Sequence, residues 1–506
     1  MKEESNQRKM GAFLSYISII ANTLVQLLYT PFLIKSLGQS EYGLYSLIAS
    51  IISYLTVLDL GFGNALVVYT AKYRAQKKYD EEKKLHGMFF IIFCFIGLVA
   101  AILGLLLFFN INTIFKNTMT NSELSKARIM MLILTINLAV TFPFNIYSSI
   151  LNAYERFSFQ KIMSILNTLL KPIIMIPLLL VGFKSISMVV VITIINIFVC
   201  ISNYLYCKKK LNINIKFIGF DKKLFKIILS YSIWIFLGTI VDKINWSLDQ
   251  FVLGAVSGTI AVSIYSVAST LNHLFINLST AISGVFLPKM SKLVANNEEE
   301  KLTDEFIKIG RIQYLVIFLM CSGLVLFGKE FIQLWVGKGF EESYYVALIL
   351  IIPLCVPLIQ NLGLSIMQAK NKIKFKSITT FIMAIFNVII SVFLAKKYGA
   401  IGSAIGTSIS LVVCNIFIIN IYYYKVIKLN IIKFWKEILK MTISFILPII
   451  VILIVRYFIK LNILWSFIIF GSIYTILYII TCYFITMNNY EKSLVISILK
   501  KLKLVR

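Results

Sequence analysis

Charged residues are scarce in this sequence, and acidic residues are the scarcest of them. Of the 506 residues only 14% are charged, with 22 Asp and Glu against 50 Lys and Arg, which gives a formal net charge of +28. Soluble domains carry about 25% charged residues, whereas 59% of this chain is apolar. The composition therefore excludes a soluble globular domain, an intrinsically disordered chain and a secreted disulfide scaffold.

Motifs for metal, nucleotide and catalytic chemistry are also missing. The seven cysteines are scattered, with no C-x-x-C or His/Cys metal spacing, which is typical of apolar packing residues. No G-x-x-x-x-G-K-[ST] phosphate loop occurs, which argues against ATP hydrolysis. The glycine-rich run from Gly399 to Gly406 opens an apolar helix and follows no soluble strand, so it favours close helix packing. We expect no catalytic residue, no metal site and no cofactor.

Long apolar runs are what the sequence has in abundance. A spanning helix needs about 20 mostly apolar residues. Fourteen stretches reach that length, beginning near Ala12, Leu44, Gly87, Ile129, Ile162, Ile186, Ile227, Gly258, Ile312, Ser343, Ser377, Ala400, Met441 and Ile463. The first is longer than the apolar region of a signal peptide, so we expect it to be retained. The sequence predicts an all-α polytopic membrane protein with about 14 transmembrane helices.

Lysine and arginine are distributed unevenly between the loops. Successive loops lie on opposite sides of the membrane. The loops on the same side as the two termini carry far more basic residues than the loops on the other side. Because basic residues collect in cytoplasmic loops, we expect both termini in the cytoplasm. The partner of these loops is then anionic membrane lipid rather than nucleic acid.

Two segments of the first half recur in the second half. The identities are Leu33/Leu253, Gly38/Gly258, Tyr45/Tyr265 and Ser46/Ser266 at an offset of 220 residues, and Ala153/Ala369, Phe159/Phe375 and Ile162/Ile378 at an offset of 216. A duplication predicts two six-helix lobes in parallel pseudo-repeat, residues 1–210 and 211–427. Two C-terminal helices and a cytoplasmic tail follow in residues 428–506. Parallel-repeat transporters bind substrate at the repeat interface.

Four helices at matching repeat positions carry polar side chains on one face. They are Ser15, Ser18, Asn22, Gln26 and Tyr29 in the first span; Ser46, Ser50 and Ser53 in the second, with Asp59 and Asn64 further along; Thr239, Asp242, Asn245 and Asp249 in the seventh; and Ser266, Thr270, His273, Asn277 and Thr280 in the eighth. Helix packing and cavity lining explain the serines equally well. For Asn22, Gln26, Asp242 and His273 a cavity is favoured, because an unpaired polar group in hydrocarbon costs several kcal/mol. His273 could also carry a proton, although a lone histidine in a polar stripe is more often structural.

Charged residues inside the spans are the strongest functional signal, because each costs about 2.5–3.5 kcal/mol at a helix centre. Lys171 lies near the middle of the fifth span, and Asp59 lies in the inner half of the second. Either the two form a structural pair, or Lys171 binds an anionic substrate while Asp59 binds a coupling cation or holds the fold. Near the outer end of the seventh span, Asp242 is a candidate ion ligand, and we expect Lys243 and Asp249 to be solvated.

Five segments together carry a family resemblance. They are TPFLIKSLGQSEYGLYSL from Thr30, LDLGFGNAL from Leu58, DQFVLGAVSGTIAVSIYSVAS from Asp249, AISGVFLPKMS from Ala281 and KYGAIGSAIGTSIS from Lys397. Spread over essentially the whole chain, they resemble the polysaccharide transporter branch of the multidrug/oligosaccharidyl-lipid/polysaccharide (MOP) flippase superfamily, which includes the O-antigen and capsular repeat-unit flippases. Many relatives have an arginine shortly after the D-x-G of the second helix, where this chain has Val67, Val68 and Tyr69.

The resemblance implies a flippase of the bacterial inner membrane. Two six-helix lobes would alternate between inward-open and outward-open states and move undecaprenyl-diphosphate-linked oligosaccharide repeat units to the external leaflet, for O-antigen, capsule or exopolysaccharide synthesis. Polysaccharide polymerase machinery is an implied further partner. We expect Lys171 to favour the diphosphate, and the membrane potential or coupling to H+ or Na+ to drive export. Sugar ligands would be Asn22, Gln26, Tyr29, Ser53, Asn64, Thr270 and Asn277, and cation-coupling residues Asp59, Asp242 and His273.

Three alternatives remain open. A multidrug exporter of the same superfamily usually has twelve helices and a tight acidic cation site, so the two additional C-terminal helices argue against it. A membrane glycan polymerase or ligase would be an enzyme, and such enzymes generally need a substantial external loop with catalytic residues. A purely structural assembly partner would not need polar stripes on four repeat-related helices.

Overall fold

The computed structural model describes residues 2–217, 221–459 and 461–501, and these residues form helices joined by short connections. Contacts divide the chain into two units. Unit 1 contains Met1–Ser266 and Ser391–Ser403, and unit 2 contains Val267–Ile390 and Ala404–Arg506. The two units are defined by which residues contact each other. The division expected from the sequence, after residues 210 and 427, is based on the internal repeat and stays a prediction.

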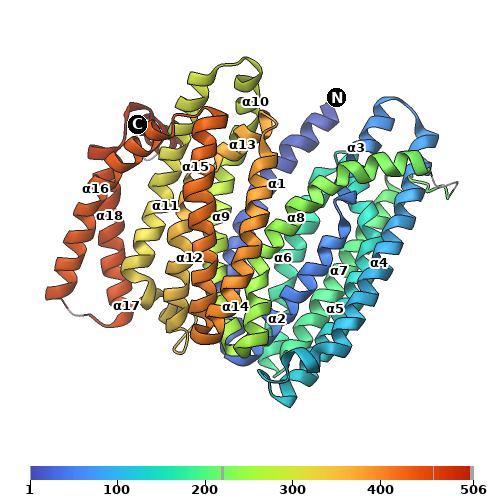
Figure 1. Cartoon of the computed structure of the whole chain (residues 1–506), viewed down its shortest axis with the longest axis horizontal. Helices are drawn as coiled ribbons and strands as arrows, with labels where there is room; N and C mark the ends of the chain where they lie inside the picture. Colours follow the sequence, from blue (N-terminus) through green and yellow to red (C-terminus); the bar gives the residue numbers. More distant parts are fainter. Residues whose placement is uncertain (1, 218–220, 460, 502–506) are drawn as a thin grey trace. The chain divides into compact units, whose positions relative to one another are not determined.

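Unit 1 is built from long helices that suit apolar runs bounded by polar connections (Figure 1). Its elements are α1 (Lys2–Leu37), α2 (Gln39–Leu55), the short η1 (Thr56–Asp59), α3 (Phe62–Ala75), α4 (Tyr79–Phe115), α5 (Asn121–Ala153), α6 (Phe157–Leu180), α7 (Ser185–Lys209), α8 (Lys222–Val256) and the first part of α9 (Gly258–Ser283). Aromatic and aliphatic side chains from α3, α4 and α5 form its core, with Phe62, Phe89 and Phe142 almost wholly buried.

Unit 2 takes the rest of α9 and most of the second half of the chain. Its elements are η2 (Gly284–Phe286), α10 (Leu287–Ala295), α11 (Glu299–Trp335), α12 (Glu341–Ile359), α13 (Leu362–Ala369), α14 (Ile373–Leu411, shared with unit 1), η3 (Val412–Ile418), α15 (Ile419–Tyr422), η4 (Tyr423–Ile427), α16 (Ile431–Phe458), α17 (Ile463–Trp465), η5 (Ser466–Phe470), α18 (Gly471–Thr481), η6 (Cys482–Thr486) and α19 (Asn489–Lys501).

Twelve segments among the described residues are long and apolar enough to cross a membrane, against the fourteen expected from the sequence. One of the twelve, Ile373–Ile427, contains two expected spans, which meet at Gly399, where the backbone leaves helical geometry (φ 53°, ψ −132°). The expected seventh span lies in α8, where several side chains, including that of Asp242, are outside the described residues. Among the described residues of α8, the segment Ser247–Val256 is an apolar helix that is too short to count as a span. The chain is therefore an all-helical, multi-pass membrane protein.

One pair of repeat-related glycines has matching backbone geometry. Gly38 has φ 84° and immediately precedes α2, and its sequence counterpart Gly258 has φ 82° and begins α9. L-residues with a side chain rarely adopt this left-handed conformation, whereas glycine adopts it without steric cost. The same turn thus starts both helices, as a duplication of the first half predicts.

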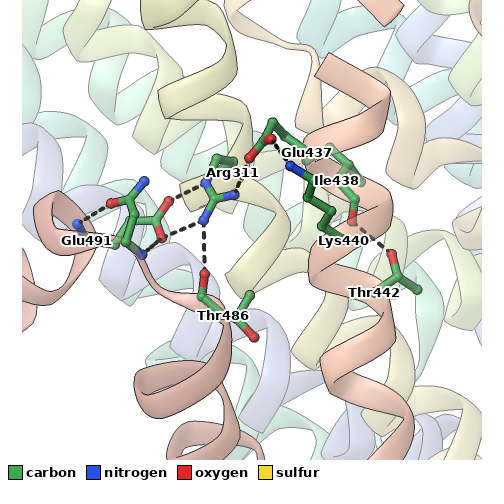
Figure 2. Close-up of polar contacts among 8 residues, drawn as sticks. Arg311, Glu437, Ile438, Lys440, Thr442, Thr486 and Glu491 are labelled. Carbon is green, nitrogen blue, oxygen red and sulfur yellow. Dashed lines mark hydrogen bonds and ion pairs between the residues drawn. The ribbon is translucent and has the colours of Figure 1, made fainter. Parts of the chain in front are cut away.

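In unit 2 the last helices pack against α11. Figure 1 shows α16 and α18 running near α11, and the three helices contact one another. The ring of Phe318 stacks on that of Phe445 with centroids 4.9 Å apart, and the Tyr478 hydroxyl donates to the Leu315 carbonyl at 2.8 Å. In the first half of α11, the guanidinium of Arg311 binds the carboxylates of Glu437 and Glu491 (Figure 2). The two appended helices therefore belong to the core of unit 2.

Candidate functional site

Helices α1 and α6 pack side by side in a parallel register. A Cβ on Gly11 would lie 2.6 Å from the Phe157 Cβ, and the hydroxyls of Ser18 and Ser164 are 3.4 Å apart. In both pairs the two residues are 146 positions apart in the sequence, so α1 and α6 run in the same direction and keep a constant register. Continuing this register places Gln26 beside Pro172, and therefore within one helical turn of Lys171.

Two amide oxygens on α1 and α6 are buried without a hydrogen-bond partner among the described residues. The side-chain oxygens Oε1 of Gln26 and Oδ1 of Asn167 are both buried, and neither has a hydrogen bond among the described residues. Asn167 precedes Lys171 by one turn of α6, which puts the two side chains on the same face of the helix. Lys171 itself is half-buried, and no ion pair is recorded for it within the described part of the chain. Buried acceptors without a hydrogen bond are costly unless a ligand or water satisfies them.

Asp59 has a local partner and does not pair with Lys171. Its Oδ2 accepts a bond from the backbone N–H of Gly63 at 3.4 Å, at the break between η1 and α3. No ion pair between Asp59 and Lys171 occurs among the described residues. The capping geometry fits the reading that Asp59 holds the fold at this break.

The remaining expected sugar ligands lie in both units. In unit 1, Asn22 and Asn64 are exposed, Tyr29 is half-buried, and Ser53 on α2 reaches Ser247 on α8 with 3.5 Å between the hydroxyls. In unit 2, α9 carries the half-buried Thr270 and Asn277 and the exposed His273. Asp242 lies on α8, and its side chain is outside the described residues.

Asp249 is buried, contrary to the expectation that it is solvated. Only 3% of the residue is exposed, and its carboxylate accepts bonds from the Tyr265 hydroxyl at 2.5 Å and the Ser403 hydroxyl at 2.8 Å. These donors come from α9 and from the part of α14 that belongs to unit 1. The expectation was wrong because position along α8 does not reveal what packs against it; the neighbours lie up to 154 residues away.

A polar network joins the helix ends of unit 1 that lie away from the N-terminus. Glu41 on α2 binds Lys126 on α5, and it also accepts from the Ser185 hydroxyl at 2.9 Å at the start of α7. Glu123 on α5 accepts from the Thr259 hydroxyl of α9 at 2.8 Å and from Ser40 of α2. Four helices are thereby held together at one end.

Helices α2 and α9 touch at a glycine in the same region. A Cβ on Gly43 would collide with the backbone carbonyl of Thr259 and lie 3.2 Å from the Cβ of Ser263. Gly43 and Ser263 are counterparts under the offset of 220 residues, so repeat-related positions pack against each other, as in an isologous contact. The helices α2 and α9 are therefore in direct backbone contact here, and we call this the closed end of unit 1.

Sequence reasoning missed Asn167 and the burial of Asp249. A signal for Asn167 was present, because an amide four residues before a lysine inside an apolar span shares its helix face. For Asp249 no local signal exists. Among the described residues, no group of three or more His, Cys, Asp or Glu side chains is arranged to hold a metal ion.

Comparison with known proteins agrees with this architecture. Residues 9–294 match the model of the family described as polysaccharide biosynthesis protein. A candidate O-antigen transporter of Shigella flexneri is 22% identical over 401 residues, covering 77% of this chain and 91% of the relative. The capsular polysaccharide biosynthesis protein CapF of Staphylococcus aureus is 29% identical over 230 residues, covering 43% of this chain and 54% of the relative.

Solved structures show the same fold. The lipid II flippase MurJ in an inward closed conformation superposes with a TM-score of 0.74 at 19% identity, over 93% of this chain and 97% of that one. An inward-facing multidrug resistance transporter of the MATE family superposes with a TM-score of 0.61 at 16% identity, over 79% and 96%. The chain belongs to the polysaccharide biosynthesis protein family.

Proposed function

We propose that this chain is a flippase that moves undecaprenyl-diphosphate-linked oligosaccharide repeat units from the cytoplasmic to the external leaflet, for O-antigen, capsule or exopolysaccharide synthesis. The observation that carries the proposal is that the amide oxygens of Gln26 and Asn167 are buried without a hydrogen bond on the two packed helices, α1 and α6, of which α6 also carries Lys171. The family and the candidate O-antigen transporters among its relatives supply the chemical class of the substrate.

The chemistry of this group suits a glycan on a diphosphate. Sugar hydroxyls donate hydrogen bonds, and the side-chain oxygens of Gln26 and Asn167 can accept them once the amides rotate toward a substrate. The ammonium of Lys171 can pair with a phosphate oxygen as a compact point charge. Asn22, Tyr29, Ser53, Asn64, Thr270 and Asn277 complete the proposed set of sugar ligands.

In the proposed topology the chain crosses the bacterial inner membrane fourteen times, and both termini lie on the cytoplasmic side. The twelve candidate spans reach this count when the segment divided at Gly399 counts as two and α8 counts as one. The lobes are residues 1–210 and 211–427, and residues 428–506 follow them. In this orientation the closed end of unit 1, around Gly43 and Thr259, faces outward.

Two drives are compatible with this arrangement. Outward movement of an anion gains about 2.3 kcal/mol per charge for each 100 mV of an inside-negative potential. Coupling to H+ or Na+ entry needs a carboxylate or histidine that can change its occupancy, for which Asp59, Asp242 and His273 are candidates. Asp249 joins them, because its carboxylate is buried and bonded to the hydroxyls of Tyr265 and Ser403.

Deletion and complementation test the proposal. A deletion strain should accumulate carrier-linked repeat units inside the cell and lose surface polysaccharide, and the wild-type gene should restore both. Lys171→Ala at wild-type protein level should fail to restore export, whereas Lys161→Ala, which removes the same charge nearer the start of α6, should succeed. An unchanged pool in a strain without a second flippase would contradict the proposal, and drug sensitivity in its place would favour the multidrug exporter.

A further inference from the structure

A pocket of about 430 Å3 lies between the end of α4 and the start of α5, and none of the proposed sugar ligands lines it. The two helices are in close contact deeper in the span, where a Cβ on Gly97 would lie 2.8 Å from the Ala139 carbonyl and one on Gly104 would collide with the Thr135 side chain. The pocket is found beyond this contact, around Phe108 and Asn112.

Four polar side chains line the pocket, namely Asn112 on α4 and Asn121, Ser125 and Arg128 on α5. No hydrogen bond from any of these four side chains to a described residue of the chain is recorded, and no carboxylate lies within ion-pair distance of the guanidinium. The one contact of Arg128 is with the ring of Phe108, whose centroid is 4.9 Å from its Cζ. The guanidinium is thus positioned on an aromatic face while its N–H donors remain available.

Polarity changes along the pocket in a direction that suits a lipid. Asn121, Ser125 and Arg128 lie in the first two turns of α5, and Ile129, Leu132 and Ile133 follow deeper in the span. From the first polar residue to Leu132 the helix rises about 16 Å. A ligand that fills the pocket must therefore have an anionic head at the helix ends and an apolar chain directed toward the middle of the membrane.

We propose that this pocket binds a membrane glycerophospholipid, whose phosphate is held by Arg128, Asn112, Asn121 and Ser125 and whose acyl chain lies along Ile129 and Leu132. Arginine is suited to a phosphate because its planar fork can donate two parallel hydrogen bonds. The lipid belongs to the external leaflet if the proposed topology holds, but the pocket and its charge do not depend on the proposed function. A bound lipid here would support α4 and α5 at the end of unit 1 that carries Glu123.

Native mass spectrometry of the purified full chain tests the proposal. Phosphatidylglycerol and diacylglycerol with the same acyl chains are supplied separately, and we expect only the phosphorylated lipid to be retained. Arg128→Gln should lower its retention about tenfold, which corresponds to about 1.4 kcal/mol and is within the range of a charge-assisted hydrogen bond. The matched control is Lys116→Gln, because Lys116 is exposed near the same helix ends but does not line the pocket.

A second measurement needs no variant. Phosphatidylglycerol with a photoreactive group near the head of one acyl chain should label wild-type peptides that contain Phe108 or residues 129–133. Equal retention of diacylglycerol, equal retention by Arg128→Gln, or labelling elsewhere would overturn the proposal. Displacement of the phospholipid by undecaprenyl diphosphate at lower concentrations than phosphatidylglycerol itself needs would assign the pocket to the carrier lipid and also overturn it.

Discussion

Arg311 and Glu491 lie 180 residues apart and form a two-pronged ion pair (Figure 2). Nε of the arginine donates to Oε1 at 2.7 Å and Nη2 to Oε2 at 3.0 Å, with both side chains at most 8% exposed. Nη1 also reaches Glu437 on α16 at 3.0 Å. Glu491 in turn accepts from the backbone N–H of Asn488 at the start of α19. One guanidinium thus ties three helices of unit 2 together.

Removing the guanidinium should destabilise unit 2. Arg311→Ala leaves the carboxylate of Glu491 buried without a counter-ion, which costs about 3–5 kcal/mol. We expect a clearly lower melting temperature in detergent and faster proteolysis within residues 487–501. Lys433→Ala is the matched control, because its ion pair with Asp304 is exposed and such pairs contribute only about 0–1 kcal/mol. Equal melting temperatures for the two variants would contradict this role of Arg311.

The amides near Lys171 should show opposite effects on stability and on transport. Gln26→Leu and Asn167→Leu each remove a buried, unpaired oxygen, so each should raise stability by about 1–3 kcal/mol while export of repeat units falls. Thr168→Val is the control, since its hydroxyl already bonds to the Ser164 carbonyl at 3.1 Å and should affect neither measurement much. Loss of stability in the leucine variants would indicate a structural role for the amides.

Enlarging Gly43 should open the closed end of unit 1. In a chain without its native cysteines, Ser263→Cys reports access through labelling by a membrane-impermeant maleimide. Gly43→Leu forces α2 away from the Thr259 carbonyl, so we expect faster labelling than in the parent. Gly323→Leu serves as the control because no atom lies within 4 Å of a Cβ built there. Unchanged labelling with Gly43→Leu would show that this contact does not seal the end.

Replacement of Asp249 should change how transport depends on ions. Asp249→Asn keeps the shape of the side chain and one oxygen that can accept from one of the two hydroxyls, of Tyr265 or Ser403, while its NH2 group can donate to the oxygen of the other. The variant should therefore fold, but it can no longer exchange a proton or neutralise a cation. In reconstituted vesicles we expect flipping by the wild type to respond to a pH or Na+ gradient and flipping by Asp249→Asn to lose that response. If flipping by Asp249→Asn still responds to the gradient, Asp249 is not the coupling residue, and Asp59, Asp242 and His273 remain the candidates.

Properties that depend on neighbouring residues in the chain were readable from the sequence. Apolar runs of spanning length fixed the helical membrane class, because hydrocarbon requires every backbone polar group to be paired within the segment. The shared left-handed turn at Gly38 and Gly258 agrees with the repeat inferred from identities at one offset. Lys171 was recognisable as a candidate because a charge in mid-span is costly wherever its helix packs.

Properties that depend on distant residues were decided only by the tertiary structure. The burial of Asp249 results from Tyr265 and Ser403, and the ion pair of Arg311 needs a glutamate from the last helix. No local pattern encodes these partners, because hydrogen bonding and burial depend on which helix faces meet. The sequence alone predicted a helical, multi-pass membrane protein with polar residues in its spans. Packing decided which of its charged side chains are paired and which buried acceptors remain without a hydrogen bond among the described residues.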